Sequence, residues 1–146
     1  IMRDPHIGTF GMLTLILAIG LKASILSQLS QEGLAWSALV VAATLSRTVM
    51  TLCMILISPA RTNGLGHDSG QPTATNALQA LILGSAISIV FFGFISSIFI
   101  VSIAILGMAL ITWLAHSQLG GYTGDVLGAI QQTAEVFILC VIGALL

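Results

Sequence analysis

The forty residues from Ala77 to His116 contain no Asp, Glu, Lys or Arg. A helix needs about 20 apolar residues to cross the ~30 Å hydrocarbon core of a bilayer, so this run is long enough for two crossings. Of all 146 residues, 57% are hydrophobic and only 6% are charged, whereas a soluble domain carries roughly 25% charged residues. So few charges cannot cover the surface of a soluble fold. We therefore expect an integral membrane protein.

We expect an all-α, polytopic membrane helix bundle with about five transmembrane helices. The predicted spans are residues 7–29, 34–58, 77–94, 97–116 and 125–146, and together they form one integral-membrane domain. The two spans of the long apolar run are predicted to join in a tight turn between Gly93 and Ser97. The segment Ala60–Asn76 is rich in Gly, Pro, Asn and Thr, which is typical of a loop.

Five spans place the connecting segments alternately on the two faces of the membrane. One face, called side A, receives residues 1–6, Ala60–Asn76 and Gln118–Gly124. Both loop arginines, Arg3 and Arg61, fall on side A, while the opposite face, side B, carries Glu32. The positive-inside rule then makes side A cytoplasmic. We expect a multi-pass protein of the inner (cytoplasmic) membrane whose active face is side A.

The composition limits the partners and the metal sites. The net charge is −1 and no basic patch is visible, so we expect the lipid bilayer as a partner and no nucleic acid. Cys53 and Cys140 both lie in apolar runs and show neither a metal-ligand spacing nor a disulfide framework, which predicts two free thiols. His6 and His67 share side A with several carboxylates, but no metal-ligand spacing links them.

The stretch "GGYTGDVLGA" (Gly120–Ala129) leads from a glycine-rich turn into the last span. Asp125 has two interpretations. It could cap the helix by accepting hydrogen bonds from free N–H groups. Alternatively, the four glycines of this stretch leave the backbone bare for the close approach of a phosphate or a cofactor. Further along, Gln132 and Glu135 fall on the helix stripe headed by Asp125, and Glu135 should face a partner or a wet cavity.

Two cations lie inside predicted spans. Arg47 could form an ion pair with Glu135, or it could bind an anion at membrane depth, where its planar guanidinium suits phosphate oxygens. Lys22 lies nearer the side B end of its span, so we expect its ammonium group to extend toward that interface.

Four motifs follow one another along the chain: "IMRDPHIGTFG" (Ile1–Gly11), Ser46-Arg47, "NGLG" (Asn63–Gly66) and "GGYTGDVLGAIQQTAE" (Gly120–Glu135). In this order the chain resembles the cobalamin synthase, or adenosylcobinamide-GDP ribazoletransferase, family. The resemblance covers the whole chain, and the last motif is its most specific part. The positions that match the family are Asp4, Gly8, Gly11, Lys22, Arg47, Gly64, Gly66, Gly121, Thr123, Asp125 and Glu135.

The chain also departs from the family pattern. Gln132 replaces the first of two acidic residues in the last helix, and Pro5-His6 stands where many members carry serine and arginine. The family's acidic "HLDGLADT.DG" segment precedes the "MRD" motif and is not in this sequence. We therefore expect this chain to be the C-terminal part of the enzyme and to be inactive alone.

The resemblance implies a phosphotransfer reaction that needs Mg²⁺. A ribose hydroxyl of α-ribazole, or of its 5′-phosphate, attacks the cobinamide-bearing phosphorus of adenosylcobinamide-GDP, and GMP leaves. Splitting a diphosphate requires a metal across its oxygens and cations on its charge. The catalytic residues implied are Asp4, Arg47, Asp125 and Glu135, with Asp4 and Asp125 as metal ligands. The phosphate-binding residues implied are Arg61, Gly64, Gly66, Gly121, Thr123 and Gly124.

Two other functions stay open at this point. A transporter or channel fragment would line an ion pathway with charged residues, but it should place polar groups on both faces. A CDP-alcohol phosphotransferase-like membrane enzyme would need a dense aspartate motif, which this sequence lacks. The oligomeric state is also open, with a homo-oligomer as one option.

Overall fold

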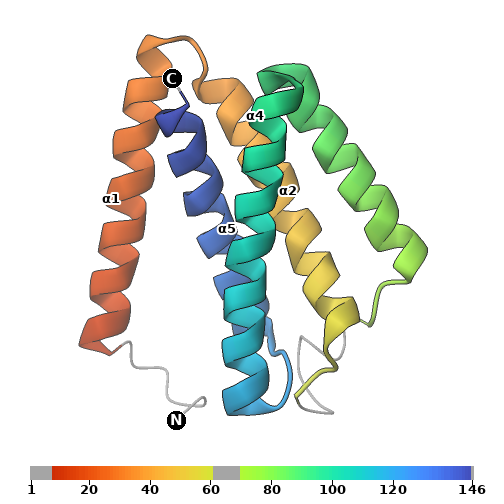
Figure 1. Cartoon of the computed structure of the whole chain (residues 1–146). Coiled ribbons are helices and arrows are strands. Elements are labelled where there is room, and N and C mark those ends of the chain that lie inside the picture. The colour runs from red at the N-terminus through yellow and green to blue at the C-terminus, as the bar shows by residue number, and fades with distance from the viewer. Residues whose placement is uncertain (1–7, 61–69, 146) are drawn as a thin grey trace.

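The structure, a computed structural model, describes residues 8–60 and 70–145. The described residues form four helices: α1 (Thr9–Gln31), α2 (Ala35–Leu56), α4 (Ala74–Leu119) and α5 (Gly124–Ala144), shown in Figure 1. All four are long and apolar enough to cross a membrane. The prediction of an all-α membrane bundle is confirmed.

Helix α4 consists of two helical halves that meet at Gly93. This residue has φ 77° and ψ 171°, which is not helical, and the ribbon reverses direction at this point (Figure 1). Across the turn, the buried hydroxyl of Ser88 donates to that of Ser97 at 3.0 Å, and Ser97 also donates to the Gly93 carbonyl at 2.7 Å. The predicted turn is therefore present, and the described part of the chain contains five apolar helical segments.

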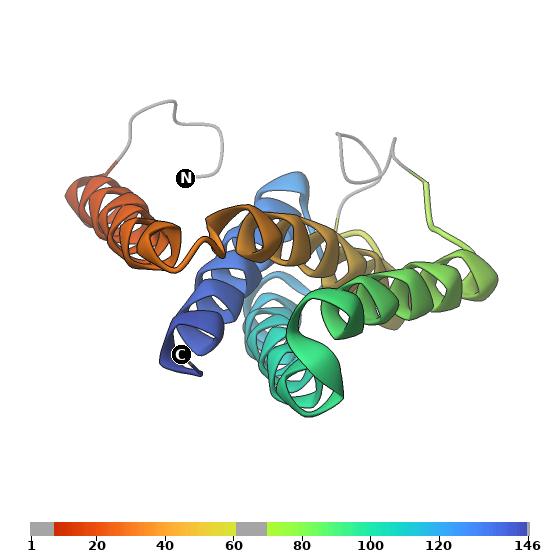
Figure 2. The same ribbon diagram turned by 90° about the horizontal axis from the view of Figure 1, so that it is seen from above.

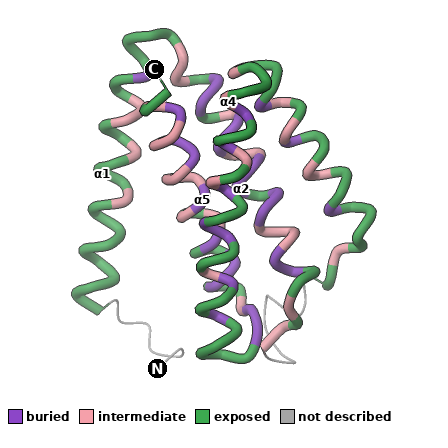
Figure 3. Tube along the Cα trace, viewed as in Figure 1, coloured by how far each residue is buried: buried purple, intermediate pink, exposed green. Residues whose placement is uncertain are grey.

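Helices α2, α4 and α5 contain nearly all of the core. Buried residues follow one face of α2 and one face of α5 and continue onto α4, as the purple segments of Figure 3 show. In α1 the one buried residue is Leu29. This helix contacts α5 and α2 but not α4, and it lies on the opposite flank of the molecule from the first half of α4 (Figure 2).

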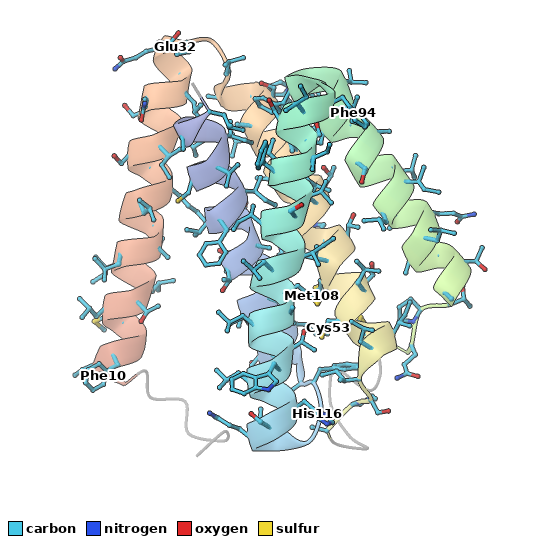
Figure 4. The ribbon with its side chains drawn as sticks, in the orientation of Figure 1. Phe10, Glu32, Cys53, Phe94, Met108 and His116 are labelled. Atoms are coloured by element: carbon cyan, nitrogen blue, oxygen red, sulfur yellow. The ribbon has the colours of Figure 1, made fainter. Side chains whose placement is uncertain are left out.

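The two ends of the bundle carry different segments. Phe10, at the start of α1, and His116, near the end of α4, lie at one end, whereas Glu32 and Phe94 lie at the other (Figure 4). The first end corresponds to side A and the second to side B. The connections thus alternate between the ends in the order expected for five spans.

Candidate functional site

The glycine-rich turn before α5 is fixed to the end of α2. Tyr122 donates its backbone N–H to the Ser58 carbonyl at 3.1 Å, and its own carbonyl accepts from the Ala60 N–H at 2.9 Å. These two bonds form an isolated bridge between Pro59 and Tyr122. Two segments that are far apart in the sequence therefore meet at side A.

Gly121 permits this close approach. A Cβ atom at Gly121 would collide with the Ser58 carbonyl oxygen and would lie 2.8 Å from the backbone nitrogen of Ala60. Gly120 ends α4 in the left-handed conformation, with φ 73°, and its N–H bonds to the His116 carbonyl. Backbone packing accounts for Gly121, and the left-handed backbone conformation accounts for Gly120.

Tyr122 anchors the turn in the core. Its side chain is only 1% exposed, and its hydroxyl has no hydrogen-bond partner among the described residues. Burial raises the pKa of this phenol, so the hydroxyl stays neutral at physiological pH. The turn therefore rests on one buried aromatic residue and two backbone hydrogen bonds.

Thr123, not Asp125, caps helix α5. Its backbone is extended, and its hydroxyl accepts the N–H of Val126 at 3.4 Å. The interpretation of Asp125 as the N-cap is wrong, because the threonine two residues earlier occupies that position. Asp125 lies in the first turn of α5 and is exposed. Its carboxylate is favourably placed near the positive end of the helix dipole and is not needed for capping.

Asp125 also borders a cavity of about 260 Å³ between the end of α4 and the start of α5. Gln118 is a second polar residue on its wall, and the remaining lining is apolar, including Leu114, Ala115 and Ala129. The site thus combines one acidic group, one amide and an apolar surface at side A.

Deeper in the bundle, Lys22 of α1 binds two residues of α5. Its ammonium group donates to Gln132 Oε1 at 2.7 Å and to Glu135 Oε2 at 2.9 Å. The side chains of Lys22 and Glu135 are both 19% exposed. The prediction that Lys22 extends toward the side B interface is therefore wrong. Of the two alternatives for Arg47, the ion pair with Glu135 is not formed, because Glu135 pairs with Lys22. The expectation that Glu135 faces a partner holds.

Arg47 lies on an exposed part of α2. Its Nη1 donates to the Ala43 carbonyl of the same helix at 2.8 Å. The residue borders a cavity of about 380 Å³ between α2 and the first half of α4, where Thr44 and Thr48 supply hydroxyl groups. Both hydroxyls already donate to backbone carbonyls, that of Thr44 to Val40 and that of Thr48 to Thr44. Anion binding, one of the two interpretations of Arg47, therefore rests on the guanidinium group alone.

Several predicted site residues lie outside the described part of the chain. They are Asp4, Arg61, Gly64 and Gly66. Among residues 8–60 and 70–145, no three His, Cys, Asp or Glu side chains come together as a metal site. Cys53 and Cys140 are free thiols, as predicted.

Comparison with known families gives a match over nearly the whole chain. The family model described as cobalamin-5-phosphate synthase matches residues 1–143. The chain belongs to the cobalamin-5-phosphate synthase family. The resemblance drawn from the four sequence motifs is thereby confirmed, and neither a transporter nor a CDP-alcohol phosphotransferase is supported.

Curated relatives are similar to this chain along its whole length. An adenosylcobinamide-GDP ribazoletransferase of Bradyrhizobium diazoefficiens is 36% identical over 146 residues, which cover 99% of this chain and 55% of the relative. The protein of the same name from Shewanella baltica is 35% identical over 153 residues, with 100% and 58% covered. The chain thus spans about half the length of the curated relatives it matches. No solved structure matches it.

Proposed function

We propose that the protein containing this chain is an adenosylcobinamide-GDP ribazoletransferase, as its relatives are named. In this reaction a ribose hydroxyl of α-ribazole, or of its 5′-phosphate, attacks the cobinamide-bearing phosphorus. A new P–O bond forms, the P–O bond to GMP breaks, and the hydroxyl proton is lost. The products are adenosylcobalamin, or its 5′-phosphate, and GMP.

The observation that carries this proposal is the exposed carboxylate of Asp125 at side A. Because Thr123 caps α5, Asp125 is not required to hold the helix end and is available to a ligand. It borders the 260 Å³ cavity between α4 and α5. An acidic group at a helix start, next to an apolar cavity, suits a phosphate–metal complex attached to a large organic group.

We assign Mg²⁺ to this end of the bundle. A single carboxylate is compatible with Mg²⁺, which keeps several waters and needs one or two carboxylates in addition to phosphate oxygens. Asp125 would hold the ion together with Asp4, which precedes α1 in the sequence. When bound, the ion would neutralise charge on the diphosphate and polarise the phosphorus that is attacked.

The phosphate groups would be bound by cations and by backbone N–H groups. Arg61 and the "NGLG" glycines, Gly64 and Gly66, belong to the loop on side A. Gly124 is exposed in the first turn of α5, where unpaired N–H groups favour anions. Arg47 lies deeper and would meet a phosphate only if the substrate enters between α2 and α4. We place side A in the cytoplasm, where the nucleotide substrate is available.

The direct test is an assay of the full-length protein in membranes. We expect adenosylcobinamide-GDP and α-ribazole to give GMP and adenosylcobalamin, detected by mass spectrometry, only when Mg²⁺ is present. Removal of Mg²⁺ with EDTA should stop GMP release, and readdition should restore it. Release of GMP without formation of the corrinoid nucleotide would contradict a transferase, because it would indicate hydrolysis.

A further inference from the structure

Helix α1 is held to the bundle by little apolar packing. Its buried residue is Leu29, near its side B end, and its large apolar side chains closer to side A are exposed, such as Phe10 at 84% and Ile16 at 60%. Another contact near side B is that of Ile25 with Gly143 of α5. Over its side A half, α1 therefore has few neighbours among the described residues.

The polar contacts of α1 lie between its packed side B end and its exposed side A half. Among the described residues, the hydrogen bonds that join α1 to another helix are those of Lys22 with Gln132 and Glu135. Lys22 is 13 residues, or about 20 Å, along α1 from Thr9 and 9 residues, or about 14 Å, from Gln31, so the pair lies well inside the expected bilayer. A charge without a partner at this depth is costly, and the pair therefore favours one separation of α1 and α5.

We propose that Lys22 is a positioning residue for the transferase reaction. Helices α1 and α5 both begin at side A (Figure 1), so the contact at Lys22 fixes how the start of α1 lies relative to Asp125. Asp4, a proposed metal ligand, precedes the first residue of α1 by five positions in the sequence. The expected effect of Lys22 on turnover rests on the proposed function. Its expected effect on the position of α1 does not.

A different role would be direct contact of Lys22 or Glu135 with the substrate. The two roles separate in a charge exchange. If the pair positions α1, Lys22→Glu combined with Glu135→Lys restores the attraction between the helices, and Gln132 can bind either charge. If either charge binds substrate, exchanging them moves that charge to the other helix and does not restore activity.

The experiment uses the full-length protein with Lys22→Glu, Glu135→Lys and both substitutions. Spin labels at Leu13→Cys in α1 and Leu119→Cys at the end of α4, in a Cys53→Ala and Cys140→Ala background, report the position of α1. Both label sites are exposed. We expect each single variant to broaden the distance distribution and to lower turnover at least about tenfold, and the double variant to recover to within about fivefold.

Two results would overturn the proposal. In the first, the single variants keep the narrow distance distribution of the parent protein. In the second, the double variant recovers that distribution but stays as inactive as the single variants, which would place a charge on the substrate. If a single variant does not insert, the double variant still decides between these outcomes. A parent protein without turnover would contradict the proposed function, while the distance distributions would still test the positioning role.

Discussion

Gly121 and Gly128 differ in what a side chain would meet. A Cβ atom at Gly121 would collide with the backbone of Ser58 and Ala60, whereas nothing lies within 4 Å of a Cβ atom at Gly128. The first glycine is therefore required by the packing of the turn on the end of α2. The second is on an exposed part of α5 and has no such constraint.

We predict that Gly121→Ala destabilises the protein by about 1–3 kcal/mol, because two backbone segments must separate to admit a methyl group. Gly128→Ala is the matched control and should be neutral or slightly stabilising, since alanine favours a helix. Thermal unfolding of the detergent-solubilised full-length protein measures both. Equal unfolding temperatures for the two variants would show that the turn does not pack on α2 in this way.

At the scale of the helices, Gly93 determines the shape of α4. Its φ of 77° and ψ of 171° lie in a region that is essentially restricted to glycine. We predict that Gly93→Ala costs about 1–3 kcal/mol of stability. The control Gly20→Ala, at an open position inside α1, should not lower the stability. The same unfolding assay applies, and an unchanged unfolding temperature for Gly93→Ala would mean that this residue is not the turn.

The turn at Gly93 could be predicted because forty uncharged residues exceed the length of one span. The Lys22–Glu135 pair could not, because its members are 113 residues apart and counting along each helix gives only approximate depths. The N-cap interpretation of Asp125 could not be rejected from the sequence, because a threonine and an aspartate both suit an N-cap. Only the backbone conformation at Thr123 decides which of them caps α5.

At the scale of the whole molecule, the two ends of the bundle are the feature to test. Asp125 lies at side A, and Glu32 lies in the exposed connection at side B. If side A is cytoplasmic, a cysteine at Asp125 should resist a membrane-impermeant thiol reagent in intact cells and react in inverted vesicles. A cysteine at Glu32 should do the reverse. Each cysteine is introduced into a background without Cys53 and Cys140. Labelling of both introduced cysteines from outside intact cells would contradict the topology.

The central claim is that the carboxylate of Asp125 serves the reaction and not the helix end. The measurement that tests it most directly is turnover of adenosylcobinamide-GDP by full-length Asp125→Asn at saturating Mg²⁺. Asparagine keeps the shape but removes the charge that a metal needs, so we predict a loss of at least about 100-fold with unchanged membrane insertion. Glu32→Gln, the same chemical change at side B, should keep normal turnover. Near-normal turnover of Asp125→Asn would contradict the account.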